Sequence, residues 1–189
     1  MHTVLILYYS KNDSTKKIAR SISRGVESVN EVSSVIRTVE SDHYCNSDDP
    51  LISKNDLKTC SGMLIGSPTH FGNMASPLKK FLDTTTDEWF NNTLEGKVGG
   101  VFTSSSSIHG GQETTLLSMM LPLIHHGMII AGVPYSESAL NSTKSGGTPY
   151  GPSHVSHNDQ IDLTEDEKAI CITYGKRVAE LVKKLNTSS

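Results

Sequence analysis

Apolar residues along this chain follow two alternating patterns: short continuous runs, and recurrences at every third or fourth position. The first run, Thr3 to Tyr8, is mostly apolar and β-branched, which predicts a central parallel strand covered on both faces. Similar runs predict four more strands, over Val32 to Val39, Gly62 to Gly66, Val98 to Thr103 and Met128 to Val133. The second of these is more polar than the first, and we expect it nearer the edge of a sheet.

Segments with helical periodicity separate these runs. Apolar residues from Ile18 to Val29 lie on one helix face, and lysines and arginines occupy the other. A helix from Ser76 to about Asp83 carries a proline in its first turn. Further helices are predicted over Lys54 to Leu57, from Gln112 to Gly127 with Pro122 expected to kink or divide it, and from the capping box Thr164 to Glu167 onward.

Two segments lack either pattern and are expected to be loops. Thr84 to Thr93 contains the only tryptophan, Trp89, and Pro134 to Leu163 is long and rich in Ser, Gly, Thr and Asn. Strands and helices otherwise alternate along the whole chain. Right-handed crossovers then predict an α/β fold, a three-layer sandwich with a five-stranded parallel sheet of order 2-1-3-4-5. We expect residues 1–189 to form a single domain of this kind.

Composition narrows the choice of partners. The 189 residues carry a formal net charge of −3 without a basic stripe, which argues against nucleic acid. The three cysteines, Cys45, Cys60 and Cys171, are scattered, and the eight histidines show no metal-binding spacing, so we expect no disulfide framework and no metal site. No apolar run is long enough to span a bilayer. These features favour a cytoplasmic protein that does not interact with membranes.

Three loops follow the first, third and fourth predicted strands, where an open α/β sheet binds its ligands. Ser10 to Thr15 offers hydroxyls and backbone N–H groups at a helix N-terminus, which suits an anion. It matches neither the dinucleotide fingerprint nor a Walker loop, and plain helix capping is the alternative. The stretches around Pro68 to Gly72 and Ser104 to Gly111 point to the same crevice. Together the loops describe a mononucleotide site with a phosphate at the first loop, as in the FMN site of flavodoxins.

Six motifs, in order over nearly the entire chain, resemble the WrbA-type NAD(P)H:quinone oxidoreductases. They are Tyr8-Tyr9-Ser10, Gly66 to Met74, Phe81-Leu82-Asp83, His109 to Glu113, His125 to Met128 and Gly146 to Gly151. The resemblance implies a flavodoxin-like fold, noncovalent FMN and a homotetramer with active sites near subunit contacts. It also implies two-electron reduction of quinones by NADH or NADPH. Because the flavin carries the hydride chemistry, we expect a ping-pong cycle with no catalytic residue supplied by the protein.

The resemblance also assigns residues by position. It implies that FMN is bound by Ser10, Lys11, Asn12, Asp13, Ser14 and Thr15 at the phosphate, by Pro68, Thr69, His70, Phe71 and Gly72 along the ribityl chain and ring, and by Ser104, Ser105, Ser106, Ser107, Ile108, His109 and Gly110 at the ring and ribityl chain. His125 would contact the flavin from a neighbouring element or subunit. Asn12 takes the position that meets the nicotinamide cofactor, and Trp89 the one that lines the substrate pocket.

Two residues depart from the family pattern. Asp13 stands where glycine is usual, and its carboxylate would repel a phosphate unless it points outward or caps the helix. His70 stands where arginine is common, so a titratable group replaces a fixed cation. Two other functions stay open: a one-electron flavodoxin-type carrier, and a flavin-poor oligomeric or regulatory protein on the same fold.

Overall fold

A parallel β-sheet lies between two layers of helices in the computed structural model, which describes residues 1–41, 48–156 and 162–186. Cys45 lies outside these ranges. Within them the strands are β1 (His2–Tyr8), β2 (Val32–Thr38), β3 (Gly62–His70), β4 (Asn73–Met74), β5 (Val98–Ser105), β6 (Ile129–Ile130) and β7 (Ser153–Val155). The helices are α1 (Ser14–Glu27), α2 (Lys54–Thr59), α3 (Ser76–Asp83), α4 (Thr86–Phe90), α5 (Gln112–His125), α6 (Ala139–Ser142) and α7 (Glu165–Asn186).

The five predicted strands correspond to β1, β2, β3, β5 and β6, and they lie in the order β2-β1-β3-β5-β6. The predicted count of five is wrong, because the described residues form a seven-stranded sheet. The two additional strands are short: β4 pairs antiparallel with the end of β3, and β7 pairs parallel with the end of β5. Such short segments carry too few residues for a periodicity to be recognised.

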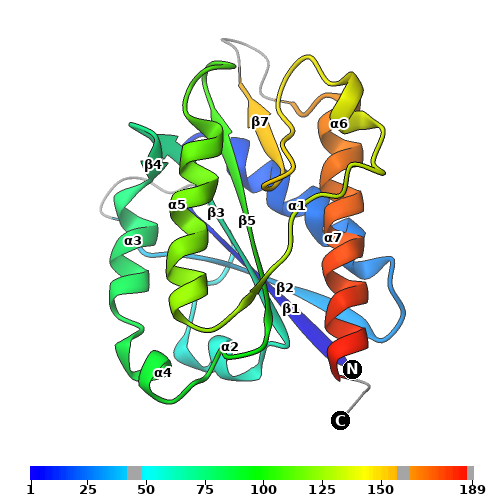
Figure 1. Cartoon of the computed structure of the whole chain (residues 1–189). Coiled ribbons are helices and arrows are strands. Elements are labelled where there is room, and N and C mark those ends of the chain that lie inside the picture. Colours follow the sequence, from blue (N-terminus) through cyan, green and yellow to red (C-terminus); the bar gives the residue numbers. More distant parts are fainter. Residues whose placement is uncertain (42–47, 157–161, 187–189) are drawn as a thin grey trace.

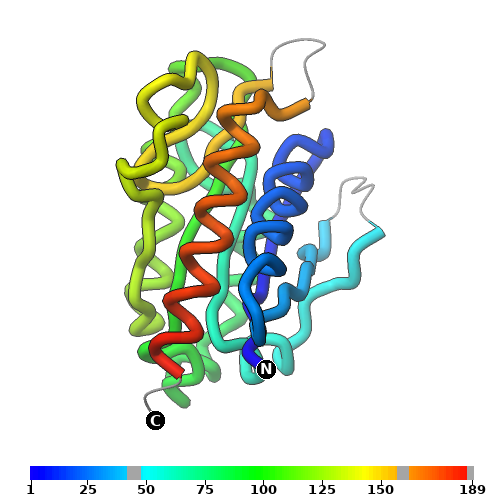
Figure 2. The backbone as a smooth tube through the Cα atoms, turned by 90° about the vertical axis from the view of Figure 1, so that its right-hand side faces the viewer, coloured from blue at the N-terminus to red at the C-terminus, as the bar shows by residue number. Residues whose placement is uncertain are grey.

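Each face of the sheet buries its own hydrophobic core, and the alternation of side chains along β1 divides its residues between them. Val4, Ile6 and Tyr8 pack on the side covered by α1 and α7. Leu5 and Leu7 pack on the side covered by α3 and α5. Figure 1 shows α3 and α5 in front of the sheet, and Figure 2 shows α1 and α7 side by side along the other face. Because both faces are covered, the central strand β1 is apolar from Val4 to Tyr8.

The fifth position of the sheet is split, which corrects the prediction of one strand over Met128 to Val133. β6 pairs only with the start of β5, and β7 takes the place beside its end. Between them the buried hydroxyl of Tyr174 in α7 accepts a hydrogen bond from the Val101 N–H (3.0 Å) and donates one to the Ala131 carbonyl (3.1 Å). A Cβ at Gly100 would lie 1.9 Å from that hydroxyl, so glycine is required there.

Three local predictions also change. Thr84 to Thr93 contains α4, so Trp89 lies on a short helix. The expected loop Pro134 to Leu163 contains α6 and β7. Pro122 lies inside a continuous α5 and does not divide it. Within the described ranges, no helix combines the length and apolar character that crossing a bilayer requires.

Candidate functional site

The carboxyl ends of β1, β3 and β5 meet around one polar pocket of about 200 Å³. Eleven of the residues predicted for the cofactor line it, together with one that was not predicted, Ser156. The lining residues are Ser10, Lys11, Asn12, Ser14, Thr15, Pro68, Thr69, His70, Ser104, Ser105, Ser106 and Ser156. Ser156 was missed because it follows β7, which the sequence pattern did not reveal. The structure therefore brings the three predicted loops to one place.

The N-terminus of α1 opens on this pocket without a side-chain cap. Asp13 is its N-cap residue but makes no capping hydrogen bond, and no acidic residue lies in the first turn. N–H groups at such a terminus attract an anion, because they lack partners and carry the positive end of the helix dipole. Thr15 and Ser104, both buried, share a hydrogen bond of 2.8 Å between their hydroxyl oxygens. This contact ties the first loop to the end of β5.

Asp13 lies at the pocket's loop but not in the pocket. Its side chain lines a groove on the outer side of α1, and one carboxylate oxygen lies 4.0 Å from Lys16 Nζ. Its φ of 60° is in the left-handed region, which glycine adopts without strain and aspartate tolerates better than most residues. The backbone thus explains why glycine suits this position. The outward carboxylate leaves the α1 N-terminus open to a phosphate.

The middle loop places Pro68, Thr69 and His70 in the pocket and leaves Phe71 outside it. Thr115 donates its hydroxyl proton to the Gly111 carbonyl (2.8 Å), so Thr69 donates to Thr115 across 2.6 Å. This hydrogen bond attaches the loop to the first turn of α5. Phe71 has a φ of 54° and is fully exposed, and Gly72 does not line the pocket.

The third loop contributes only its first half to the pocket. Ser107, Ile108, His109 and Gly110 lie outside the lining, and Ile108 is exposed. The Ser105 hydroxyl and the Gly110 N–H both bond the Ser107 carbonyl, at 2.8 and 3.1 Å, which turns the loop away toward the start of α5. Ser107 to Gly110 were predicted to contact the flavin ring and the ribityl chain, but they do not line this pocket.

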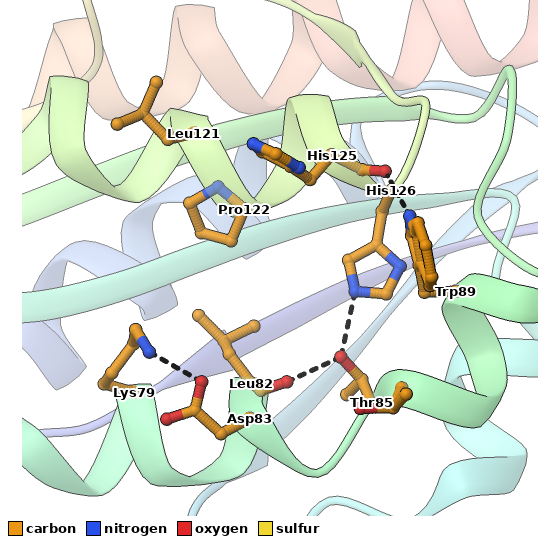
Figure 3. A pocket seen from close by; sticks show the side chains of 10 residues that line it. Lys79, Leu82, Asp83, Thr85, Trp89, Leu121, Pro122, His125 and His126 are labelled. Atoms are coloured by element: carbon orange, nitrogen blue, oxygen red, sulfur yellow. Dashed lines mark hydrogen bonds and ion pairs between the residues drawn. The ribbon is translucent and has the colours of Figure 1, made fainter.

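Trp89 and His125 lie together in a different pocket of about 410 Å³ formed by α3, α4 and the end of α5. The Trp89 indole N–H donates to the His125 carbonyl across 2.9 Å, as Figure 3 shows. In Figure 1 this end of α5 lies away from β4 and β7. No described residue lines both pockets. Within one chain, His125 therefore does not line the first pocket, and its contact with the flavin stays a prediction.

His126 lines the same second pocket in a defined tautomer. The Thr85 hydroxyl donates to the Leu82 carbonyl (2.7 Å), so its oxygen accepts from His126 Nε2 (2.9 Å), and Figure 3 shows both contacts. Nδ1 is then the unprotonated nitrogen, and it is buried without a partner among the described residues. Burial is the main cause that lowers the pKa of His126, and the nearby Glu88 carboxylate opposes it only in part.

The first pocket suits the ribityl phosphate of FMN. The uncapped α1 N-terminus and Thr15 offer N–H and O–H donors for a phosphate, and Ser104, Ser105 and Ser106 offer hydroxyls for a polyol chain. Its volume is below the roughly 300–1,000 Å³ of pockets that enclose a whole drug-sized ligand. The residues therefore fit the phosphate and ribityl portion of the cofactor.

Known proteins resemble this chain over nearly its whole length. The chain is 38% identical over 203 aligned positions to NAD(P)H dehydrogenase (quinone) of Chromohalobacter salexigens, covering 98% of this chain and 99% of that protein. Its fold is similar to a WrbA-like flavodoxin from Agrobacterium tumefaciens (TM-score 0.72, 21% identity, 97% and 99% coverage). It is also similar to a flavodoxin from the domain Archaea (TM-score 0.67, 21% identity, 96% and 99% coverage).

A family model completes these comparisons. The model described as NADPH-dependent FMN reductase matches residues 3–139, which contain the three loops of the first pocket. The family that the sequence motifs indicated is thus confirmed by full-length similarity and by the family match. The chain belongs to the NADPH-dependent FMN reductase family.

Proposed function

We propose that this protein is an FMN-dependent NAD(P)H:quinone oxidoreductase, which moves two electrons from NADH or NADPH to a quinone in a ping-pong cycle. The observation that carries the proposal is the hydroxyl-lined pocket at the uncapped N-terminus of α1, in a chain similar over its whole length to a quinone dehydrogenase. When bound, FMN supplies the ring that accepts and donates hydride.

The protein's own residues would bind the cofactor and orient it. The α1 N-terminus, Ser10 and Thr15 would hold the phosphate, while Thr69 and the serines that end β5 would bind the ribityl chain. His70 would place a titratable ring beside the cofactor, and Asn12 would meet the nicotinamide cofactor. Phe71 and the segment Ser107 to Gly110 lie outside the pocket, so any contact with the flavin ring would be made at its rim. No protein nucleophile is required.

A second copy of the chain would complete the site with Trp89 and His125, and we propose the homotetramer that the family resemblance implies. Its support is a set of exposed apolar residues on α5, Leu117, Leu121 and Ile124. Phe90 is also exposed, on α4, the helix that is hydrogen-bonded to the end of α5. Sedimentation tests this. Leu121→Glu should lower the mass of the assembly, whereas Leu185→Glu, at an exposed leucine of α7, should not. A monomeric wild-type protein with FMN bound would contradict the proposal.

Steady-state reduction of benzoquinone by NADH or NADPH, with added FMN, tests the activity. Turnover with parallel-line kinetics supports the oxidoreductase. FMN binding without turnover would favour a one-electron carrier, and absence of saturable FMN binding would favour a flavin-poor regulatory protein.

We further propose that residues 1–189 form one flavodoxin-like domain of a cytoplasmic protein, on the basis of the alternating pattern and the scattered cysteines.

A further inference from the structure

One buried carboxylate joins three separate segments behind the first pocket. Glu167, in the first turn of α7, is fully buried and accepts five hydrogen bonds. Its Oε1 accepts from the Ser145 hydroxyl (2.9 Å) and from the N–H groups of Gly146 (2.8 Å) and Val155 (3.1 Å). Its Oε2 accepts from His154 Nδ1 (2.8 Å) and the Thr164 N–H (2.8 Å).

This use of Glu167 exceeds the capping box predicted from the sequence. The capping box itself is present, because Thr164 Oγ1 accepts from the Glu167 N–H at 3.2 Å. The glycine at position 146 belongs to the same arrangement. A Cβ there would lie 2.1 Å from the Ser153 carbonyl oxygen and 2.7 Å from Glu167 Oε1. The Ser153 backbone, and to a lesser degree the Glu167 carboxylate, thus require glycine at this position of the Gly146 to Gly151 motif.

His154 is held by Glu167 through one ring nitrogen. Its Nδ1 donates to the carboxylate, and its Nε2 is buried without a partner among the described residues. Burial disfavours the charged form of Glu167, yet the hydrogen bonds from His154 and Thr164 outweigh it and lower the pKa of Glu167 to about 2.

The pair is connected to the pocket through β7. His154 lies in register with Ser104, whose hydroxyl holds Thr15 at the phosphate loop. The N–H of Ser156, which lines the pocket, donates to the Ser105 carbonyl at 2.8 Å. Neither His154 nor Glu167 lines the pocket itself. A change at His154 therefore reaches the pocket by moving β7 and the end of β5.

We propose that His154 and Glu167 are positioning residues that hold the phosphate end of the cofactor pocket in shape, and so set the affinity for FMN. The inference rests on the proposed function. The remainder of α7 is held in place without this pair, because Ile170, Tyr174 and Val178 are buried against the sheet and α1. Loss of the pair should therefore act on β7 and the pocket wall, with the fold retained.

The test compares binding of FMN with binding of riboflavin, which lacks the phosphate, by quenching of flavin fluorescence. His154→Leu removes one charge-assisted hydrogen bond and should weaken FMN binding about tenfold or more, with riboflavin affinity nearly unchanged. His154→Asn offers an amide N–H near the position of Nδ1 and should restore most of the loss. Glu167→Gln should weaken FMN in the same selective way.

Asp56→Asn is the matched control, since Asp56 caps α2 through Ser53 far from the pocket and should affect stability alone. Equal loss of FMN and riboflavin affinity in His154→Leu, or unchanged FMN affinity, would overturn the inference while the proposed function stands. The inference would also be overturned, and the proposed function left standing, if His154→Asn bound FMN no more tightly than His154→Leu. A wild-type protein without saturable FMN binding would overturn both.

Discussion

The hydroxyl oxygens of Thr15 and Ser104 lie 2.8 Å apart and join the first turn of α1 to the end of β5, across 89 positions of sequence. Both residues line the predicted cofactor pocket and both are buried. A contact between two such distant segments fixes the width of the pocket at its phosphate end. Loss of this hydrogen bond should weaken cofactor binding more than it lowers the stability of the fold.

Thr15→Val keeps the shape of the side chain and removes the hydroxyl. We expect FMN affinity to fall about tenfold, since the phosphate loses a donor and Ser104 loses its partner. Ser104→Ala should act similarly, and the double variant should lose less than the sum of both. Ser23→Ala, which breaks a similar hydroxyl pair with Ser34 away from the pocket, is the control. Fluorescence titration measures all four, and additive losses would contradict the coupling.

Tyr174→Phe removes only the hydroxyl that fills the gap between β6 and β7. The Val101 N–H and the Ala131 carbonyl then remain buried without that partner, which should destabilise the protein by about 1–3 kcal/mol. Urea unfolding measures the change. Tyr135→Phe, at an exposed tyrosine, should leave the unfolding midpoint in place. Equal midpoints for both variants would show that the hydroxyl does not support the sheet.

Gly175→Ala tests the close crossing of α1 and α7. Helix propensity alone would favour alanine by about 1 kcal/mol. A Cβ at this position, however, would lie 2.1 Å from the Ile22 carbonyl oxygen, and Gly25 faces the Ile172 carbonyl oxygen at the same distance. We expect a net loss of about 2 kcal/mol or more, because the two helices must separate. A variant more stable than wild type by thermal unfolding would refute the crossing.

His126 should make stability depend on pH below neutrality. Burial lowers its pKa in the folded state, so as pH falls through about 6.5 the unfolded chain takes up a proton that the folded protein refuses. Stability therefore declines from neutral pH toward the folded-state pKa. His126→Gln keeps a donor for Thr85 but does not titrate, and its melting temperature should fall less between pH 7 and about 5.5. An equal fall in melting temperature with pH for the wild type and His126→Gln would contradict this.

Local patterns predicted most of the elements. The apolar run from Thr3 to Tyr8 became β1 because a strand covered on both faces needs apolar side chains at every position. The periodicity from Ile18 onward became the buried face of α1. The three loops followed from strand order, since parallel strands bring their carboxyl ends to one edge. Eleven of the predicted cofactor residues therefore lie around one pocket.

Other features depend on contacts between segments far apart in sequence. The position of Trp89 and His125, away from the first pocket, follows from how α4 packs on the end of α5. The outward carboxylate of Asp13 follows from a left-handed backbone that its neighbours do not signal. Neither is encoded in a local periodicity: the sequence left the outward direction of Asp13 as one of two alternatives, and it did not separate Trp89 and His125 from the first pocket.

By itself, the sequence determined the class of fold, the strand-to-helix loops that form the pocket and the family, because these follow from local hydrophobic periodicity and from motifs. Only the tertiary structure decided how the fifth position of the sheet is divided and what lies behind the pocket. Tyr174 bonds Val101 across 73 positions, and Glu167 gathers donors from three segments. A buried polar group must find its partners wherever the fold brings them, and no local pattern records that requirement.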